Sequence, residues 1–223
     1  MSTHSQLIKH VFNRGVRKTD IFLDDNDRKR FVNLMRWYLK IDYPYSSYIT
    51  RIKQAKTQGV EPKDVYDSIL NQNALVMPPV KILAWVLMCN HFHLLLCENT
   101  DLGIARYIHR ISSAYAAYFN RRHNYSGRLF ESSYKSIVVE DENQLLYVIR
   151  YIHKNPVEVG LLDANSMDHY SWSSWLKYSY KINDGVTDSE LTEKLLGDLR
   201  IVTNSTSKND NDESPDNEFL LLE

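Results

Sequence analysis

Residues 80–97 read Val-Lys-Ile-Leu-Ala-Trp-Val-Leu-Met-Cys-Asn-His-Phe-His-Leu-Leu-Leu-Cys, and this stretch contains two of the predicted strands. Two apolar runs, rich in branched and aromatic residues, lie on either side of Cys89-Asn90. Such residues favour strands, and the short break between the runs predicts a tight connection. The stretch is therefore expected to form an antiparallel β-hairpin, entered directly after Pro78-Pro79.

Further strands and helices are predicted on both sides of this hairpin. Apolar residues at helical spacing predict three helices, over residues 25–39, 104–122 and 141–155. Short apolar runs predict two more strands, over residues 7–12 and 133–139. Pro156 is expected to end the third helix. The resulting order, βαββαβα, predicts an α+β domain with helices packed on an antiparallel sheet.

Two segments are expected to lie outside this pattern. Residues 41–77 interrupt it with two short helical patterns, near 46–57 and 62–71, and are interpreted as an insertion. After residue 181, Thr187-Asp-Ser-Glu190 has capping-box form ahead of a helix, and residues from about 203 to 218 are polar enough to be disordered. The predicted organisation is a domain over 1–181, followed by a partly disordered acidic tail over 182–223.

Charge is distributed unevenly along the chain, although the formal net charge is only -1. Residues 182–223 carry 11 acidic and 3 basic side chains, which leaves 24 basic and 17 acidic ones in residues 1–181. Basic residues gather in one stretch of the body, at Arg106, Arg110, Arg121, Arg122, Arg128 and Lys135. This stretch is either a phosphate-facing patch or an ordinary solvated helix face.

Several classes of protein find no support in the sequence. The longest apolar run, residues 82–89, is far shorter than the roughly 18 residues of a membrane span. The N-terminus lacks the apolar region of a secretory signal, so a cytoplasmic protein is expected. Cys89 and Cys97 form no CxxC motif, which favours free thiols. No phosphate-loop, dinucleotide or serine-hydrolase motif occurs.

Two groups of polar residues could carry chemistry. His91 and His93 share one face of their predicted strand, so two imidazoles could hold a divalent metal, while Phe92 points into the opposite layer. Tyr151 and Asn155 are one helical turn apart, so an amide oxygen could bind a hard cation beside a nucleophilic phenol. Both groups also fit an ordinary structural role, because single His-x-His pairs and helical tyrosines are common.

The remaining histidines offer no ligand spacing in the sequence. His153 lies two residues from Tyr151 and is expected to be exposed or to pack against its neighbours. The others are scattered without partners, at His4, His10, His109, His123 and His169.

Seven short motifs along the chain occur together in the order of a known family. They are Asn13-Arg-Gly, Asp20-Ile-Phe-Leu-Asp-Asp, Asp27-Arg-Lys-Arg-Phe, Trp85-Val-Leu-Met-Cys-Asn-His-Phe-His-Leu-Leu-Leu, Gly127-Arg-Leu-Phe, Arg150-Tyr-Ile-His-Lys-Asn-Pro and Trp172-Ser-Ser. Together they resemble the REP-associated tyrosine transposases, which are single-strand transposases of the HUH (His-hydrophobic-His) superfamily. The resemblance covers residues 7–40 and 80–178.

This resemblance implies a fold and a role for each matching residue. It implies an RRM-like or ferredoxin-like sheet with the histidine pair on a central strand. His91, His93 and Asn155 match the residues that hold Mg²⁺ or Mn²⁺, and Tyr151 matches the nucleophile. The implied reaction cleaves and rejoins single-stranded or hairpin DNA through a 5′-phosphotyrosine adduct, and a monomer or a homodimer is compatible with the family.

The chain also departs from the family pattern. Ser132-Ser133 stand where the family usually has Gly-Arg, so one basic DNA contact is missing and Arg128 or Lys135 is the candidate to replace it. The expected DNA-binding residues are therefore basic side chains along the body: Arg14, Arg106, Arg110, Arg121, Arg122, Arg128 and Lys135. The acidic tail could also occupy the basic groove as an electrostatic gate.

Two other functions compete with a tyrosine transposase. A DNA-binding module that has lost cleavage would bind DNA without forming a covalent adduct. A metal-dependent hydrolase, with water activated at His91 and His93, would turn over without a protein–DNA adduct, but two histidines and one amide make a poor zinc-hydroxide site.

Overall fold

The centre of the protein is a four-stranded antiparallel sheet with the strand order β2-β3-β1-β4. The computed structural model describes residues 7–207. Its strands are β1 (Ile8–Arg14), β2 (Val80–Leu87), β3 (His91–Glu98) and β4 (Lys135–Val139). The predicted hairpin is confirmed as β2 and β3. Strand β1 runs two residues past its predicted end because Asn13 and Arg14 still pair with β3.

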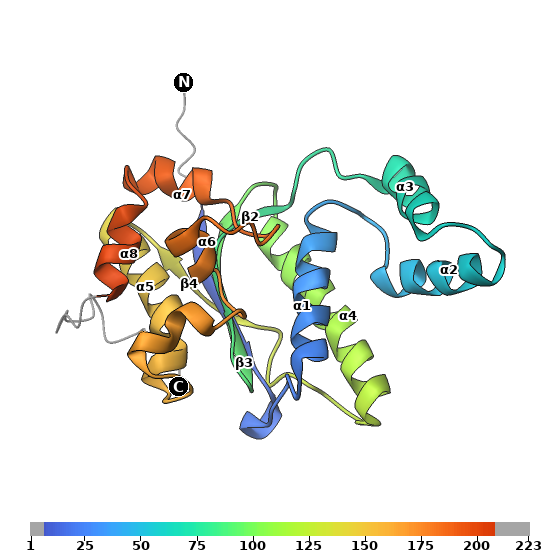
Figure 1. Cartoon of the computed structure of the whole chain (residues 1–223), viewed down its shortest axis with the longest axis horizontal. Helices are drawn as coiled ribbons and strands as arrows, with labels where there is room; N and C mark the ends of the chain where they lie inside the picture. Colours follow the sequence, from blue (N-terminus) through green and yellow to red (C-terminus); the bar gives the residue numbers. More distant parts are fainter. Residues whose placement is uncertain (1–6, 208–223) are drawn as a thin grey trace.

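Two long helices cover one face of the sheet (Figure 1). They are α1 (Asp25–Tyr38) and α4 (Gly103–His123), and both were predicted from helical spacing. The Asp24 side chain caps α1 by accepting hydrogen bonds from two backbone N–H groups of its first turn. Phe92 of β3 is fully buried beneath these helices, where its ring packs against Phe31 at 4.9 Å between centroids.

The other face is covered by helices from the C-terminal half of the chain (Figure 1). The longest is α5 (Glu142–Glu158), whose buried residues Val148, Ile149 and Ile152 pack on the sheet. The others are α6 (Trp175–Tyr180), α7 (Ser189–Leu196) and α8 (Arg200–Ser207). The order βαββαβα and the α+β fold class are therefore confirmed through α5.

The prediction that Pro156 ends this helix is wrong, because α5 continues to Glu158. A proline inside a helix removes one N–H donor, here the one that the carbonyl of Ile152 would have accepted. Burial of Asn155 and Pro156 against the rest of the domain offsets this loss. The helix ends at Glu158, and Gly160 follows with a φ of +71°, in the left-handed region that glycine adopts easily after a helix.

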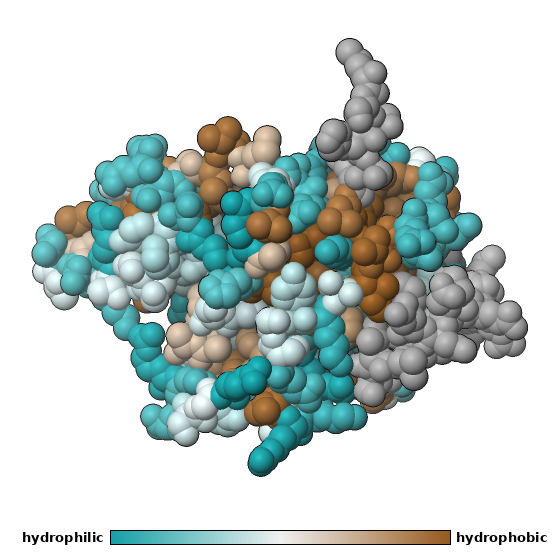
Figure 2. All heavy atoms as spheres, turned by 180° about the vertical axis from the view of Figure 1, so that it is seen from behind, coloured by the Kyte–Doolittle hydropathy of each residue, from teal (hydrophilic) through white to brown (hydrophobic). Residues whose placement is uncertain are grey.

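The predicted insertion forms a helical arm beside the α1–α4 layer (Figure 1). It consists of α2 (Tyr45–Thr57) and α3 (Pro62–Asn73), close to the two predicted helical patterns. A cluster of aromatic rings joins it to α1, with Trp37 stacked on Tyr48 at 4.5 Å between centroids. Seen from behind, the arm lies at the left with a mostly hydrophilic to neutral surface (Figure 2).

The segment that follows residue 181 differs from the expected acidic tail. Residues 182–207 are packed on the domain: Asp188 pairs with Lys81 at 3.1 Å, and its backbone N–H donates to Ile82. Asp188, within the predicted capping box, caps α7, which ends at Leu196. Helix α8 follows, with Val202 fully buried, so the predicted disorder is wrong for residues 203–207. The rest of that prediction, and the proposed gate, lie outside the described residues.

The described residues, 7–207, bear on the expectations about membrane spans and about the two cysteines. Within this range no helix combines the length and apolar character needed to cross a bilayer. Cys89 and Cys97 are free thiols, as predicted, and Cys97 is buried.

Candidate functional site

The register between β1 and β3 places four side chains on one face of the sheet. Phe12 lies opposite His93, and Arg14 lies opposite His91. Because side chains alternate along a strand, His91 and His93 both point toward α5, while Phe92 points into the other layer. The predicted common face of the two histidines is confirmed, and their rings are 5.0 Å apart between centroids.

Helix α5 brings Tyr151 and Asn155 to this same face. Both side chains are buried, with Tyr151 7% exposed and Asn155 fully buried. The ring of Tyr151 meets that of His93 edge-on, at 5.4 Å between centroids. The amide oxygen of Asn155 lies 3.2 Å from Nε2 of His91. The four residues that the sequence singled out therefore come together in the structure.

His91 has its ring fixed from both sides. Nδ1 lies 2.6 Å from the side-chain oxygen of Asn90, and Nε2 lies 3.2 Å from that of Asn155. A neutral imidazole has one N–H, so it donates to only one of these two acceptors. With the hydrogen on Nδ1, at the shorter contact, the lone pair of Nε2 faces the amide oxygen of Asn155. Burial lowers the pKa of His91 to about 4, so the imidazole stays neutral at physiological pH.

His93 contacts His10, which was expected to have no partner at ligand spacing. Nδ1 of His93 lies 2.9 Å from Nε2 of His10, and the two nearly parallel rings meet edge to edge at 5.1 Å between centroids. His10 is on β1, 83 residues away in the chain, so spacing along the sequence gave no signal of this pair. Burial lowers the pKa of His10 to about 3 and that of His93 well below its usual value.

These donors fit a divalent cation. With the hydrogen of His91 on Nδ1, Nε2 of His91 and Oδ1 of Asn155 present lone pairs at 3.2 Å from each other, an arrangement that a shared cation would stabilise. Nε2 of His93 is buried and has no hydrogen-bond partner among the described residues. Residues 7–207 contain no group of three or more His, Cys, Asp or Glu side chains that could hold a metal ion.

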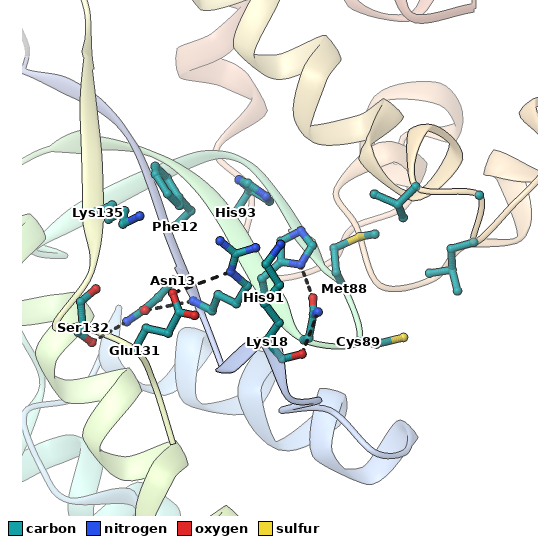
Figure 3. Close-up of a pocket in the computed structure, with 15 residues that line it drawn as sticks. Phe12, Asn13, Lys18, Met88, Cys89, His91, His93, Glu131, Ser132 and Lys135 are labelled. Carbon is teal, nitrogen blue, oxygen red and sulfur yellow. Dashed lines mark hydrogen bonds and ion pairs between the residues drawn. The ribbon is translucent and has the colours of Figure 1, made fainter. Parts of the chain in front are cut away.

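A pocket of about 430 Å³ opens beside the histidine pair. Figure 3 shows Lys135, Phe12 and His93 side by side on three neighbouring strands, with Met88 and Cys89 on the other side of His91. Its lining includes the cationic side chains of Arg14, Lys18 and Lys135 and the apolar side chains of Met88, Val159 and Leu161. Such a pocket can take a ligand that is both anionic and partly apolar.

Only two of the predicted DNA-binding residues line this pocket, Arg14 and Lys135. Nε of Arg14 lies 3.8 Å from a carboxylate oxygen of Glu131, which also lines the pocket. Arg128 is close by in the chain, and its guanidinium donates to the backbone oxygen of Glu131 at 3.0 Å.

The arginines of α4 lie in the other layer of the protein. Arg110 pairs with Asp42, and Arg106 donates to the backbone of Asp101. Arg122 pairs with Asp24 at 2.6 Å and with the buried Asp27 at 2.5 Å. Arg106 and Arg122 are 16 residues apart, about 24 Å along a helix. The structure does not bring these residues, or the exposed Arg121, to the histidine pair.

Two other histidines also gain partners in the fold. His123, expected to have none, lies 3.0 Å from a carboxylate oxygen of Asp27. His153 is buried, and its Nε2 lies 2.8 Å from the hydroxyl of Ser174, which also accepts from the backbone N–H of Trp85. His153 therefore ties α5 to the edge strand β2, which agrees with its predicted packing role.

Comparison with protein families matches residues 42–155, just over half of the chain, to the family described as IS200-like transposases. The chain therefore belongs to the IS200-like transposase family. The matched range includes His91, His93, Tyr151 and Asn155. It also includes the arm of α2 and α3, which was expected to lie outside the usual core.

Other comparisons concern curated proteins and solved structures. No curated protein matches the chain. A solved structure of a REP-associated tyrosine transposase bound to a REP hairpin is similar, with 13% identity and a TM-score of 0.47. That similarity covers 78% of this chain and 83% of the other.

Proposed function

We propose that this protein is a metal-dependent transposase that cleaves and rejoins single-stranded DNA through a 5′-phosphotyrosine intermediate. The observation that carries the proposal is the meeting of Tyr151, Asn155 and the histidine pair beside a cationic pocket. Membership of the IS200-like transposase family supports DNA as the substrate.

His91, His93 and Asn155 are proposed to hold Mg²⁺ or Mn²⁺. Nε2 of His91 lies 3.2 Å from Oδ1 of Asn155, the rings of His91 and His93 are 5.0 Å apart between centroids, and burial lowers the pKa of both imidazoles, which keeps them neutral. When bound, the cation offsets the negative charge that develops on the non-bridging oxygens of a phosphodiester.

Tyr151 is the proposed nucleophile. Its phenolic oxygen forms a bond to phosphorus as the bond between phosphorus and the 3′ oxygen breaks. The phenolic proton passes to solvent, and the departing 3′ oxygen gains a proton to become a free hydroxyl. The 5′ phosphate stays on Tyr151, so a 3′-hydroxyl can later attack the adduct and rejoin strands without ATP.

The pocket is proposed to hold the DNA next to the scissile phosphate. Arg14 and Lys135 bind backbone phosphates. Val159 and Leu161 also line the pocket and are 47% and 41% exposed, so a base removed from its stack can pack against them. The resemblance of the motifs further suggests a single strand that carries a hairpin.

An adduct assay tests this proposal. A hairpin-bearing single strand from the flanks of the gene is labelled at its 3′ or its 5′ end and incubated with protein and Mn²⁺, then separated on a denaturing gel. The proposed reaction transfers only the 3′ label to protein, because the 5′ phosphate remains on the tyrosine. Strand cleavage without an adduct would favour the hydrolase, and binding without cleavage of any flanking hairpin would favour the DNA-binding module.

A further inference from the structure

His10 lies at the centre of the site although the reaction as proposed does not use it. It sits on β1 with its side chain fully buried, and Nε2 lies 2.9 Å from Nδ1 of His93. The two ring planes lie within 22° of each other and the centroids are 5.1 Å apart, so the rings meet edge to edge, as a hydrogen bond in the ring plane requires. His10 also meets the ring of Tyr151 edge-on, at 5.8 Å between centroids.

The direction of the hydrogen bond between the two imidazoles sets which nitrogen of His93 is free, and the distance of 2.9 Å fits either direction. A neutral imidazole has one N–H and one lone pair. For Nε2 of His93 to bind a cation, its hydrogen must be on Nδ1, which then donates to Nε2 of His10. His10 must therefore carry its own hydrogen on Nδ1.

We propose that His10 is a positioning residue, which fixes the tautomer and the ring orientation with which His93 binds the cation. This inference rests on the proposed function, because it assigns His10 to the proposed cation site. Histidine ligands usually donate their second N–H to a carboxylate, a backbone carbonyl or water, and such partners strongly affect metal affinity. Here a buried neutral imidazole takes that place.

Phe12 offers a comparison that distinguishes the proposed role of His10 from a packing role. Phe12 also stacks on His93, at 5.7 Å between centroids, but its side chain can form no hydrogen bond. A packing role predicts that His10 and Phe12 matter equally for the orientation of His93. The proposed role predicts that the hydrogen-bond acceptor on His10 matters most.

The first experiment measures Mn²⁺ affinity by titration calorimetry on the full chain without DNA. His10→Leu is expected to raise the Kd by about 10- to 100-fold, as for other partners of metal-bound histidines. His10→Gln keeps an acceptor oxygen and is expected to lie closer to wild type, and Phe12→Leu is expected to change the Kd less than His10→Leu. Wild-type affinity in a folded His10→Leu protein would overturn the proposal.

The second experiment needs no variant and no metal. Long-range ¹H–¹⁵N NMR spectra of the wild-type imidazoles report which ring nitrogen carries the hydrogen. The expected result is His93 protonated at Nδ1 and His10 also protonated at Nδ1, whereas His93 protonated at Nε2 would contradict the proposal. Failure of wild-type protein to bind Mn²⁺ would instead contradict the proposed metal requirement, so the two failures are distinct.

Discussion

Nε2 of His91 lies 3.2 Å from the amide oxygen of Asn155, although 64 residues separate them in the chain. The contact joins the first residue of β3 to the last turns of α5. The proposed cation site depends on this pair of residues.

Replacing Asn155 tests this contact. Asn155→Leu has a similar volume and lacks the donor oxygen, so it is expected to weaken Mn²⁺ binding by at least about tenfold. Asn155→Asp keeps an oxygen donor and is expected to retain binding. Calorimetric titration gives both values, with far-ultraviolet circular dichroism as the control for folding. Equal Kd values for Asn155→Leu and wild type would exclude Asn155 as a ligand.

The basic residues predicted to bind DNA are expected to divide into those that contact DNA, such as Arg14, and those that stabilise the fold, such as Arg122. Arg14→Gln is expected to weaken binding of single-stranded DNA and to reduce the slope of log K against log salt by about 0.7, the value for one lost phosphate contact. Arg122→Gln is expected to leave that slope unchanged and to lower the denaturation midpoint, because Arg122 neutralises the buried Asp27. Fluorescence anisotropy at four salt concentrations measures the slopes. Equal slope changes in both variants would contradict this division.

The exposed apolar side chains that line the pocket predict that DNA binding depends on the base of one nucleotide in the substrate. Removing the base at each position in turn should weaken binding at one position beside the cut, by roughly fivefold for about 1 kcal/mol of lost apolar contact. Leu161→Ala should reduce that loss, because the contact is already absent. Val60→Ala, an exposed apolar position on the arm, is the matched control. Equal sensitivity in wild type and Leu161→Ala would argue against a base at this position.

Acid is expected to destabilise the fold through its buried histidines. Burial lowers the pKa of His153 to about 3, whereas the unfolded chain binds this proton near pH 6.5. The stability from this neutral histidine is full above pH 6.5 and is lost as pH falls toward 3, by up to about 1.4 kcal/mol per pH unit. Urea unfolding at pH 7, 6 and 5 measures this loss. His153→Gln should show a shallower dependence on pH, and parallel curves would contradict the assignment.

The sequence predicted most of the fold because its signals are local. The apolar runs on either side of Cys89-Asn90 and the helical spacing in α1, α4 and α5 depend only on residues close together in the chain. Pro156 misled the prediction because its local preference was weaker than the burial of the residues around it. The helix α8 was missed because its polar composition hides a buried face that includes Val202.

The candidate site was only partly predictable for a related reason. His91, His93, Tyr151 and Asn155 could be named because each pair is close in sequence and shares a face. His10 could not, because its contact with His93 depends on the pairing of β1 with β3. The role of the arginines of α4 could not be read from the sequence either. The acidic residues that pair with Arg110 and Arg122 come from distant parts of the chain.

The measurement that tests the central claim most directly is mass spectrometry of the trapped protein–DNA adduct after digestion with trypsin. Cleavage after Arg150 and Lys154 isolates Tyr151 on the peptide of residues 151–154, while Tyr147 stays on the peptide of residues 136–150. The account predicts a 5′-phosphonucleotide on the peptide of residues 151–154, absent from Tyr151→Phe protein that still binds DNA. An adduct on any other peptide, or one that persists in Tyr151→Phe, would contradict it.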